Sequence, residues 1–322
     1  MALLTSILVI AGLASAGAAQ QPAPRGVREL AASLRDSDPD VRAQAACSLR
    51  ELGDRAADAI PALILLLDDG SPLKGDICES GRNWGGNLDL TSPGQEAASA
   101  LVAIGTRAFE PIAGALRRPV WAARRNAAWA LGALRDPRGV PLLIDTLADR
   151  EPPVREQAAW GLGALRDTRA TAPLVARLKD DDARVREQAS WALGALRDRA
   201  SVAGLTTALK DSAAPVRRQA AWARGAIRDT GATVGLTAAL RDDDAKVREQ
   251  SAWALGALRD RNAVMPLIPL LTDGDVGVRR QAAWALGAIR DGRALEPLLT
   301  ALKDTDAAVR REAAWAVGVV NK

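Results

Sequence analysis

The stretch Val185-Arg-Glu-Gln-Ala-Ser-Trp-Ala-Leu-Gly-Ala-Leu-Arg-Asp198 decides the fold, because close variants of it return every 31 residues. A constant period of this length indicates a stack of copies of one supersecondary unit, not a single globular core. Whatever the tryptophan does is therefore repeated in successive layers of one array. The tryptophan recurs at Trp129, Trp160, Trp191, Trp222, Trp253, Trp284 and Trp315.

Each unit is predicted to contain two helices joined by short turns. The first is exemplified by residues 293–303, which carry leucines at helical spacing and a proline in the opening turns. The second begins near Val309 in that unit and contains the tryptophan phrase. In the two earliest units, Cys47 and Ser99 take the tryptophan position. The sequence therefore predicts an all-α solenoid of about nine two-helix repeats over residues 26–322.

Four features of the unit resemble the HEAT-like repeats of the phycobilisome-lyase type. They are the Val-Arg pair, the Ala-Ala-Trp-Ala-Leu-Gly-Ala-Leu run, the Arg-Asp turn and the Pro-Leu pair of the first helix. The resemblance implies a HEAT-like α-solenoid over nearly all of residues 26–322. It implies much less about function, because the family includes bilin-chromophore lyase subunits, a metal-dependent hydroxylase and many scaffolds. The hydroxylase type uses His-Glu metal pairs, and this chain has no histidine.

Composition narrows the chemistry further. Without histidine, the chain lacks the usual general base and the commonest metal ligand, so histidine-based metal or triad chemistry is excluded. We expect no metal, no cofactor and no enzymatic activity. The net charge is +4, but basic and acidic residues alternate within every repeat, which argues against a nucleic-acid partner.

The N-terminus is typical of a secretory signal peptide. A short apolar run is followed by small residues, with cleavage boxes at Ala14-Ser-Ala16 and Ala16-Gly-Ala18. The run carries no Lys or Arg before it, which departs from the usual pattern. We expect a signal peptide over residues 1–19, a linker over residues 20–25, and export to the periplasm or the extracellular space.

Helical geometry places the tryptophans away from the core stripe of their own helix. At 100° per residue from the first valine, the core positions fall between about 0° and 80° and the tryptophan near 240°. The resemblance to HEAT-like solenoids implies that the second helices line the concave side. Two interpretations stay open and overlap: the indoles form a contact ladder on this concave face, or they fill the grooves between layers. The predicted binding set contains the seven tryptophans together with Gln157, Gln188, Gln219, Gln250, Gln281, Arg218 and Arg280.

Other charges recur in step with the tryptophans. We expect the arginines of the Val-Arg pair and the aspartates of the Arg-Asp turn to bond helix ends and turns across adjacent layers. The arginines are Arg155, Arg186, Arg217, Arg248, Arg279 and Arg310, and the aspartates are Asp167, Asp198, Asp229, Asp260 and Asp291.

The repeat is broken at three places, where function is most expected. An insertion of about residues 69–93 carries Cys78, which either forms a disulfide with Cys47 or remains a separate thiol. Arg224 occupies a core leucine position, where its guanidinium must either reach water or pair with an acid, and we expect it to reach water. The last helix has no polar cap, which predicts either end-to-end contact with another chain or fraying.

These observations predict an exported, non-catalytic scaffold that binds a protein or peptide on the concave, tryptophan-bearing face. A regular row of contacts suits a long or repetitive partner. Two alternatives stay open: binding of carbohydrate or cell-wall glycan by the indoles, and a role as an accessory subunit related to chromophore lyases.

Overall fold

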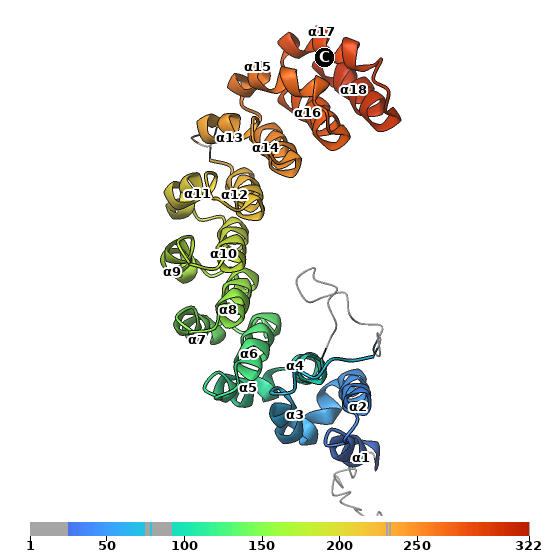
Figure 1. Cartoon of the computed structure of the whole chain (residues 1–322), viewed down its shortest axis with the longest axis vertical. Helices are drawn as coiled ribbons and strands as arrows, with labels where there is room; N and C mark the ends of the chain where they lie inside the picture. Colours follow the sequence, from blue (N-terminus) through green and yellow to red (C-terminus); the bar gives the residue numbers. More distant parts are fainter. Residues whose placement is uncertain (1–24, 75–77, 79–91, 230, 232, 322) are drawn as a thin grey trace, which may run out of the picture.

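A computed structural model describes residues 25–74, 78, 92–229, 231 and 233–321 of the chain. The helices stack side by side into an arch (Figure 1). All regular elements in these ranges are α-helices or short 3₁₀ turns, as the sequence predicts for an all-α solenoid. The predicted signal peptide, the linker up to residue 24 and most of the insertion lie outside the described residues.

Each layer pairs a short outer helix with a longer inner one. The outer helices are α1 (Arg25–Ser33), α3 (Ile60–Leu66), α5 (Phe109–Ala115), α7 (Gly139–Thr146), α9 (Thr171–Arg177), α11 (Val202–Ala208), α13 (Thr233–Ala239), α15 (Val264–Leu267) and α17 (Leu295–Ala301). The inner helices are α2 (Pro39–Leu52), α4 (Pro93–Ile104), α6 (Trp121–Leu134), α8 (Pro152–Leu165), α10 (Ala183–Leu196), α12 (Ala214–Ile227), α14 (Ala245–Leu258), α16 (Val276–Ile289) and α18 (Ala307–Val320).

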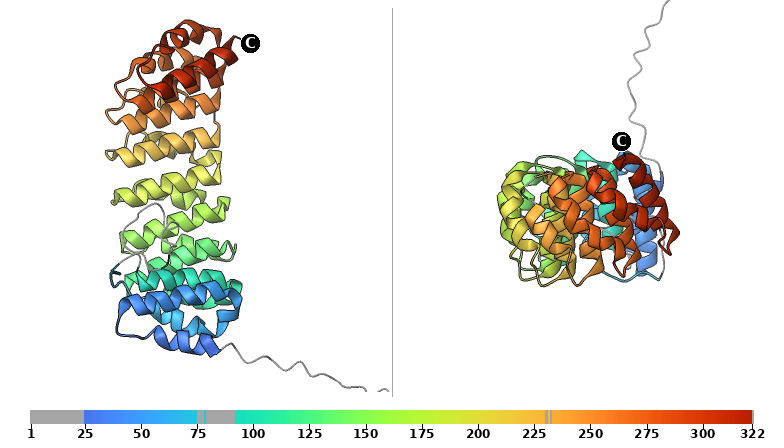
Figure 2. Two further views of the ribbon diagram at one scale, coloured as in Figure 1. Left: turned by 90° about the vertical axis from the view of Figure 1, so that its right-hand side faces the viewer. Right: turned by 90° about the horizontal axis from the view of Figure 1, so that it is seen from above.

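The inner helices line the concave side of the arch (Figure 1). They contact one another in succession, and each also packs on the outer helix of its own layer. Seen from the side, the helices lie across the array like rungs, and their ends form its two long edges (Figure 2). We call the edge that carries the C-termini of the inner helices the C-terminal rim, and the opposite edge the N-terminal rim.

The ends of the inner helices follow from local side-chain chemistry. Aspartate caps such as Asp182 and Asp244 accept hydrogen bonds from backbone amides of the first turn. From α6 to α16, each inner helix ends at an arginine in the left-handed conformation. Within α10, the core positions Val185, Ala189 and Leu193 are fully buried, as the helical wheel predicts.

No helix in the described ranges is long and apolar enough to cross a bilayer.

Candidate functional site

The tryptophans of the repeat lie between successive inner helices and reach the concave face. Those of α8 to α16 are partly buried against the core, whereas Trp129 is 7% exposed and Trp315 is 44% exposed. The rings of Trp129 and Trp160 stack with their centroids 6.1 Å apart. The indoles from Trp160 onward therefore pack adjacent layers and also form part of the surface, whereas Trp129 is buried.

A glycine in the preceding inner helix makes room for each indole from Trp160 to Trp315. A Cβ atom added to Gly163 or Gly194 would lie 2.5 Å from Cζ3 of the next layer's tryptophan. The same added atom on Gly194 would also lie 2.8 Å from the backbone Cα of Ala223. Glycine weakens a helix interior, so its place in the phrase is explained by this close approach. The sequence showed this glycine but not what it meets.

A shallow groove of about 430 Å³ lies across α12, α14 and α16. These helices line the concave side of the arch (Figure 1). The groove combines two indoles with amide and charged side chains, so it offers both apolar area and hydrogen-bonding groups. It brings together predicted residues from three layers, and Lys246 and Glu249 join them. The lining residues are Arg218, Trp222, Lys246, Glu249, Gln250, Trp253 and Gln281.

The glutamines of the predicted set line up along the same face. All five are partly exposed, and none makes a hydrogen bond through its side chain within the part of the chain that the structure describes. A primary amide can donate two hydrogen bonds and accept two, so each layer presents unused hydrogen-bonding capacity beside its indole. These residues are Gln157, Gln188, Gln219, Gln250 and Gln281.

The predicted arginines of the face are held by carboxylates of neighbouring layers. Arg218 Nη2 lies 3.2 Å from Glu187 Oε1, and Arg280 Nη2 lies 3.6 Å from Glu249 Oε1. Their side chains stay 44% and 50% exposed, so both cations can still meet a ligand. Lys246 also reaches Glu249, at 2.9 Å. Exposed pairs of this kind contribute little to stability.

Five of the six predicted Val-Arg arginines bond to the turn of the next layer, as the sequence predicts, whereas Arg310 of the last layer binds carbonyl oxygens of its own turn. Each of these five arginines, and also Arg124, which follows Ala123 in α6, forms a two-pronged ion pair with the aspartate that follows the next layer's outer helix, with shortest N···O distances of 2.6–2.8 Å. We call these pairs the interlayer forks. They join Arg124 to Asp149, Arg155 to Asp180, Arg186 to Asp211, Arg217 to Asp242, Arg248 to Asp273, and Arg279 to Asp304.

The forks hold their aspartates ionised. Burial alone would raise the pKa of Asp211, but hydrogen bonds from Arg186 and from the Ala213 amide outweigh it, and the pKa is lowered. At Asp273, the hydrogen bond from Arg248 is the leading cause of the lowered pKa. Four aspartates of the Arg-Asp turns cap the following 3₁₀ turn: Asp167, Asp198, Asp260 and Asp291. Asp198 and Asp260 also accept hydrogen bonds from Thr171 and Thr233, each 27 residues earlier. Asp291 also binds Arg293, and its pKa falls to about 2.

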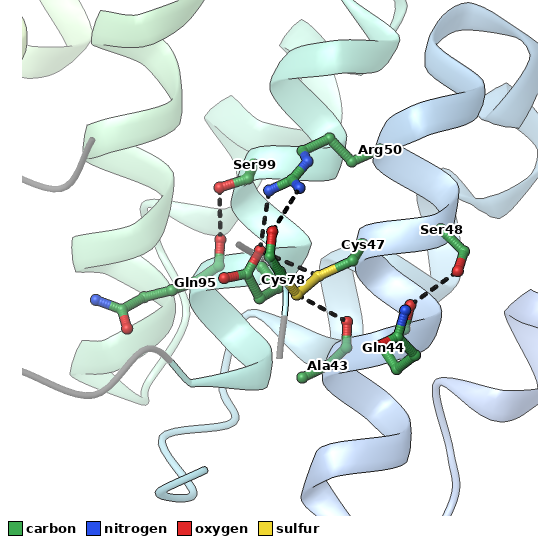
Figure 3. The surroundings of a disulfide bond; sticks show 9 residues. Ala43, Gln44, Cys47, Ser48, Arg50, Cys78, Gln95 and Ser99 are labelled. Carbon is green, nitrogen blue, oxygen red and sulfur yellow. Dashed lines mark hydrogen bonds and ion pairs between the residues drawn. A yellow bond between two sulfur atoms is a disulfide. The ribbon is translucent and has the colours of Figure 1, made fainter. Parts of the chain in front are cut away.

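The first two layers replace the tryptophan with other contacts. Cys47 is bonded to Cys78 in the insertion, with their Cα atoms 6.0 Å apart (Figure 3). Glu96 of α4 is 2% exposed and pairs with Arg50 of α2 at 3.3 Å. Arg50 also donates a hydrogen bond to the Cys78 carbonyl at 3.4 Å. Because the two sulfurs are joined to each other, neither offers a thiolate to a metal ion.

Arg224 corrects the expectation that its guanidinium reaches water. The residue is 2% exposed inside α12. Its Nη1 atom lies 3.4 Å from Asp229 Oδ2 and 3.4 Å from the Val202 carbonyl oxygen. Its Nε atom has no hydrogen-bond partner among the described residues. Burial lowers the pKa of Arg224, because the charged form loses hydration. This layer therefore contains an incompletely satisfied charge in its core.

Trp121 is a site residue that the repeat pattern does not identify. It begins α6, lies outside the 31-residue series and is 40% exposed. The Arg125 guanidinium lies over its ring, 5.4 Å from the centroid. Its exposure could not be inferred from the period, because no other layer has an aromatic residue at that position.

Solved structures with the same kind of fold were found by structural comparison. YibA of E. coli aligns with a TM-score of 0.62 at 19% identity, covering 85% of this chain and 94% of its own. Kap95p, solved in complex with RanGDP, aligns with a TM-score of 0.68 at 15% identity, covering 91% of this chain and 47% of its own. A chain of the CpcE–CpcF phycocyanin lyase complex from Nostoc sp. PCC7120 has 24% identity and a TM-score of 0.46, covering 66% and 94%. At these identities the likeness concerns the fold alone.

Sequence-family comparison agrees with the structure. No curated protein sequence matches the chain significantly. The family model for HEAT repeats matches residues 94–159, 140–225 and 233–318, which together cover more than half of the chain. The model for the PBS lyase HEAT-like repeat matches residues 41–69. The predicted resemblance is thereby confirmed, and the chain belongs to the HEAT-repeat family.

Proposed function

We propose that this chain is an exported, non-catalytic scaffold that binds a protein or peptide partner on its concave face. The observation that carries the proposal is the groove across α12, α14 and α16, where partly exposed indoles alternate with unpaired glutamine amides. Indoles bury large areas on binding, and amides can pair with the backbone of a bound chain. The same pair recurs layer after layer, which suits an extended partner.

The structural neighbours support a protein partner as the first choice. Kap95p, with the highest of the three TM-scores reported, binds another protein, RanGDP, in the solved complex. We carry over only the use of such a solenoid as a binding surface. Catalysis has less support: the sequence has no histidine, and the groove combines arginine, lysine, glutamate and amides without a paired nucleophile and base.

Site-specific photocrosslinking tests the proposed face. A photoreactive amino acid is placed at Gln250 on the concave side, or at Val234, which is 84% exposed on the outer helix of the same layer. We expect one partner to be captured from Gln250 and not from Val234, and the purified partner to bind with measurable affinity. Equal capture from both positions would contradict a concave binding face.

Glycan binding is the less favoured alternative. Each indole from Trp160 onward lies against a glycine of the preceding helix, which leaves less of its ring free to stack on a sugar. Pull-down on insoluble glycans separates the two proposals: retention of the chain that is lost in Trp191→Ala and Trp253→Ala variants would favour the glycan.

Export is a separate part of the proposal and rests on residues 1–19. Mass spectrometry of the protein recovered from outside the cytoplasm tests it. We expect a new N-terminus after one of the two small-residue boxes; an intact N-terminus confined to the cytoplasm would refute export.

A further inference from the structure

Six arginines cap the inner helices from α6 to α16 in an unfavourable backbone conformation. Their φ angles lie between 53° and 59°, in the left-handed region. For a residue with a side chain this conformation is unfavourable, because Cβ comes too close to the following carbonyl oxygen. The six residues, which we call the rim arginines, are Arg135, Arg166, Arg197, Arg228, Arg259 and Arg290.

The fold does not require arginine at this position. The inner helices of the first two layers, α2 and α4, end at Gly53 and Gly105, which also have positive φ angles. Glycine adopts positive φ without the steric cost and is the usual residue at helix C-termini. In six layers, therefore, a side chain is kept at a position where its absence would stabilise the helix end.

The rim arginines make no internal contact that would explain them. All six are exposed, and within the described ranges none of their guanidinium groups forms a hydrogen bond or an ion pair. The arginines of the interlayer forks are the opposite case, since each binds a carboxylate and backbone carbonyls. Favourable interaction with the helix dipole needs a cation near the C-terminus, but not one in a strained conformation. A strained backbone conformation that no internal contact of its side chain explains is typical of functional residues.

The fold gathers these cations on one edge of the molecule. Because the inner helices are stacked in parallel, all their C-termini lie on the C-terminal rim (Figure 2). From each rim arginine to the end of the turn that follows it, the sequence contains eleven arginines against six aspartates, a net charge of +5. The corresponding loops of the N-terminal rim contain thirteen carboxylates against five cations, and the interlayer forks neutralise one carboxylate in each layer.

We propose that the C-terminal rim is a binding site for an anionic lipid surface. With layers about 8–10 Å apart, the six arginines extend over roughly 40–50 Å. Lipid headgroups diffuse laterally and can meet each cation whatever the spacing. Each arginine near such a surface strengthens binding by roughly fivefold, so six give useful affinity.

The shape of the rim favours a surface over a stiff polymer. The rim curves with the arch in Figure 1, but in the side view of Figure 2 the helix ends follow a nearly straight edge. Such a rim can lie flat on a plane, whereas a rod such as duplex nucleic acid would leave the arc after a few layers. With this edge on the lipid, the concave face stays open to its own partner.

Vesicle co-sedimentation tests the assignment on the full chain. The vesicles are phosphatidylcholine alone, or phosphatidylcholine with about 30% phosphatidylglycerol. One variant changes Arg135, Arg166, Arg197, Arg259 and Arg290 to glycine; its matched control changes the five cations of the N-terminal rim loops, Arg150, Lys179, Lys210, Arg241 and Lys303, to glutamine. We expect at least roughly tenfold weaker binding to the anionic vesicles for the glycine variant only.

A second readout separates loss of binding from loss of folding. Because glycine relieves the left-handed strain, the glycine variant is expected to melt at the same temperature as the parent chain or higher. A lysine variant at the same five positions should keep most of the binding. Equal binding to neutral vesicles, equal loss in the two charge variants, or binding to soluble heparin but not to vesicles would overturn the proposal. Photocrosslinking from Gln250 reports on the concave face independently of these outcomes.

Discussion

The layers from α8 to α16 and the first two layers use different residues to fill the space between adjacent inner helices. In the later layers an indole enters a space left by glycine, and an interlayer fork holds the edge. In the first two layers Cys47 and Ser99 replace the tryptophan, and the disulfide with the Arg50–Glu96 pair joins α2, α4 and the insertion. Among the described residues of these two layers, the counterpart of an interlayer fork is the ion pair between Arg42 and Asp69, at 2.7 Å.

The difference shows what a layer needs from its neighbour. It needs a group that fills the space between two inner helices, and it needs a charged contact at the N-terminal rim. Between the second and third layers, the ion pair has the opposite polarity. Gly94 of α4 occupies the position of the fork arginine, and Arg118 of the third layer instead binds Asp68 of the second layer. The filler can be an indole or a disulfide, but only the indoles leave a repeated surface on the concave face.

Removing the disulfide should have the largest effect on stability. For a separation of 31 residues, loss of the cross-link costs about 3–4 kcal/mol. In a Cys47→Ala, Cys78→Ala variant we expect faster hydrogen exchange in α2 and α4, with α14 and α16 unchanged, because layers couple mainly to their neighbours. Equal loss of protection along the whole array would contradict separate reinforcement of the first layers.

Replacing a glycine that contacts an indole by a larger residue should have the second-largest effect on stability. Gly194→Val places side-chain atoms against Trp222 and the backbone of Ala223, and should cost about 3 kcal/mol, measured by denaturant unfolding. Gly318→Val is the matched control, because a Cβ there meets nothing within 4 Å. Similar losses in the two variants would mean that helix propensity, not indole packing, keeps the glycine.

Breaking one interlayer fork should have a moderate effect. Arg186→Met leaves the partly buried Asp211 carboxylate without its guanidinium and should cost about 2 kcal/mol. In Arg310→Met the cost should be smaller, since that guanidinium binds only the carbonyl oxygens of Asp304 and Thr305. Thermal melting of both variants measures the difference, and equal destabilisation would argue against the carboxylate contact.

Restoring the regular core residue in α12 should stabilise the chain. Arg224→Leu removes a buried guanidinium whose Nε atom has no partner among the described residues, and should gain about 1–2 kcal/mol. The same variant should slow hydrogen exchange in α11 and α12. A loss of stability would show that the pairing with Asp229 is worth more than a leucine in that position.

Lowering the pH should reduce the stability of the later layers, and the interlayer forks should be the first contacts affected. The fork aspartates and Asp291 have lowered pKa values in the folded chain, so their contribution is complete above the unfolded value near 4 and is lost as the pH falls below it. For Asp291 the loss ends near its folded pKa of about 2. We expect a flat melting temperature from about pH 7 to about pH 5 and a decline below about pH 4. A decline beginning above pH 5 would contradict this account.

Much of the array can be predicted from the sequence because the signal is repeated. The 31-residue period and the leucine spacing predict the two-helix layer, and the helical wheel places Val185 and Leu193 in the core while it places Trp191 off it. The wheel describes one helix, however, so it cannot say what an indole meets in the next layer; the glycine contact needed the stacked structure.

Charge was the least predictable feature, for a related reason. In the sequence the signs alternate within each repeat, yet the parallel stacking of the inner helices sorts them onto opposite rims. The sequence does not identify the fork partners, because several aspartates recur in step with the arginines: Asp198 caps its own turn, while Asp211 lies close in space to Arg186. For Arg224 the sequence leaves contact with water and pairing with an acid as alternatives, because the wheel cannot show that Asp229 and the Val202 carbonyl lie within reach.

The affinity of the crosslinked partner for two matched triple variants measures whether the concave face binds that partner. One variant changes Gln219, Gln250 and Gln281 on the concave face to alanine. The other changes Thr206, Val234 and Met265, exposed residues of the outer helices in the same layers, to serine, alanine and alanine. We predict at least roughly tenfold weaker binding for the first variant, no change for the second, and unchanged melting for both. Equal affinity of the two variants would contradict a binding role for the concave face.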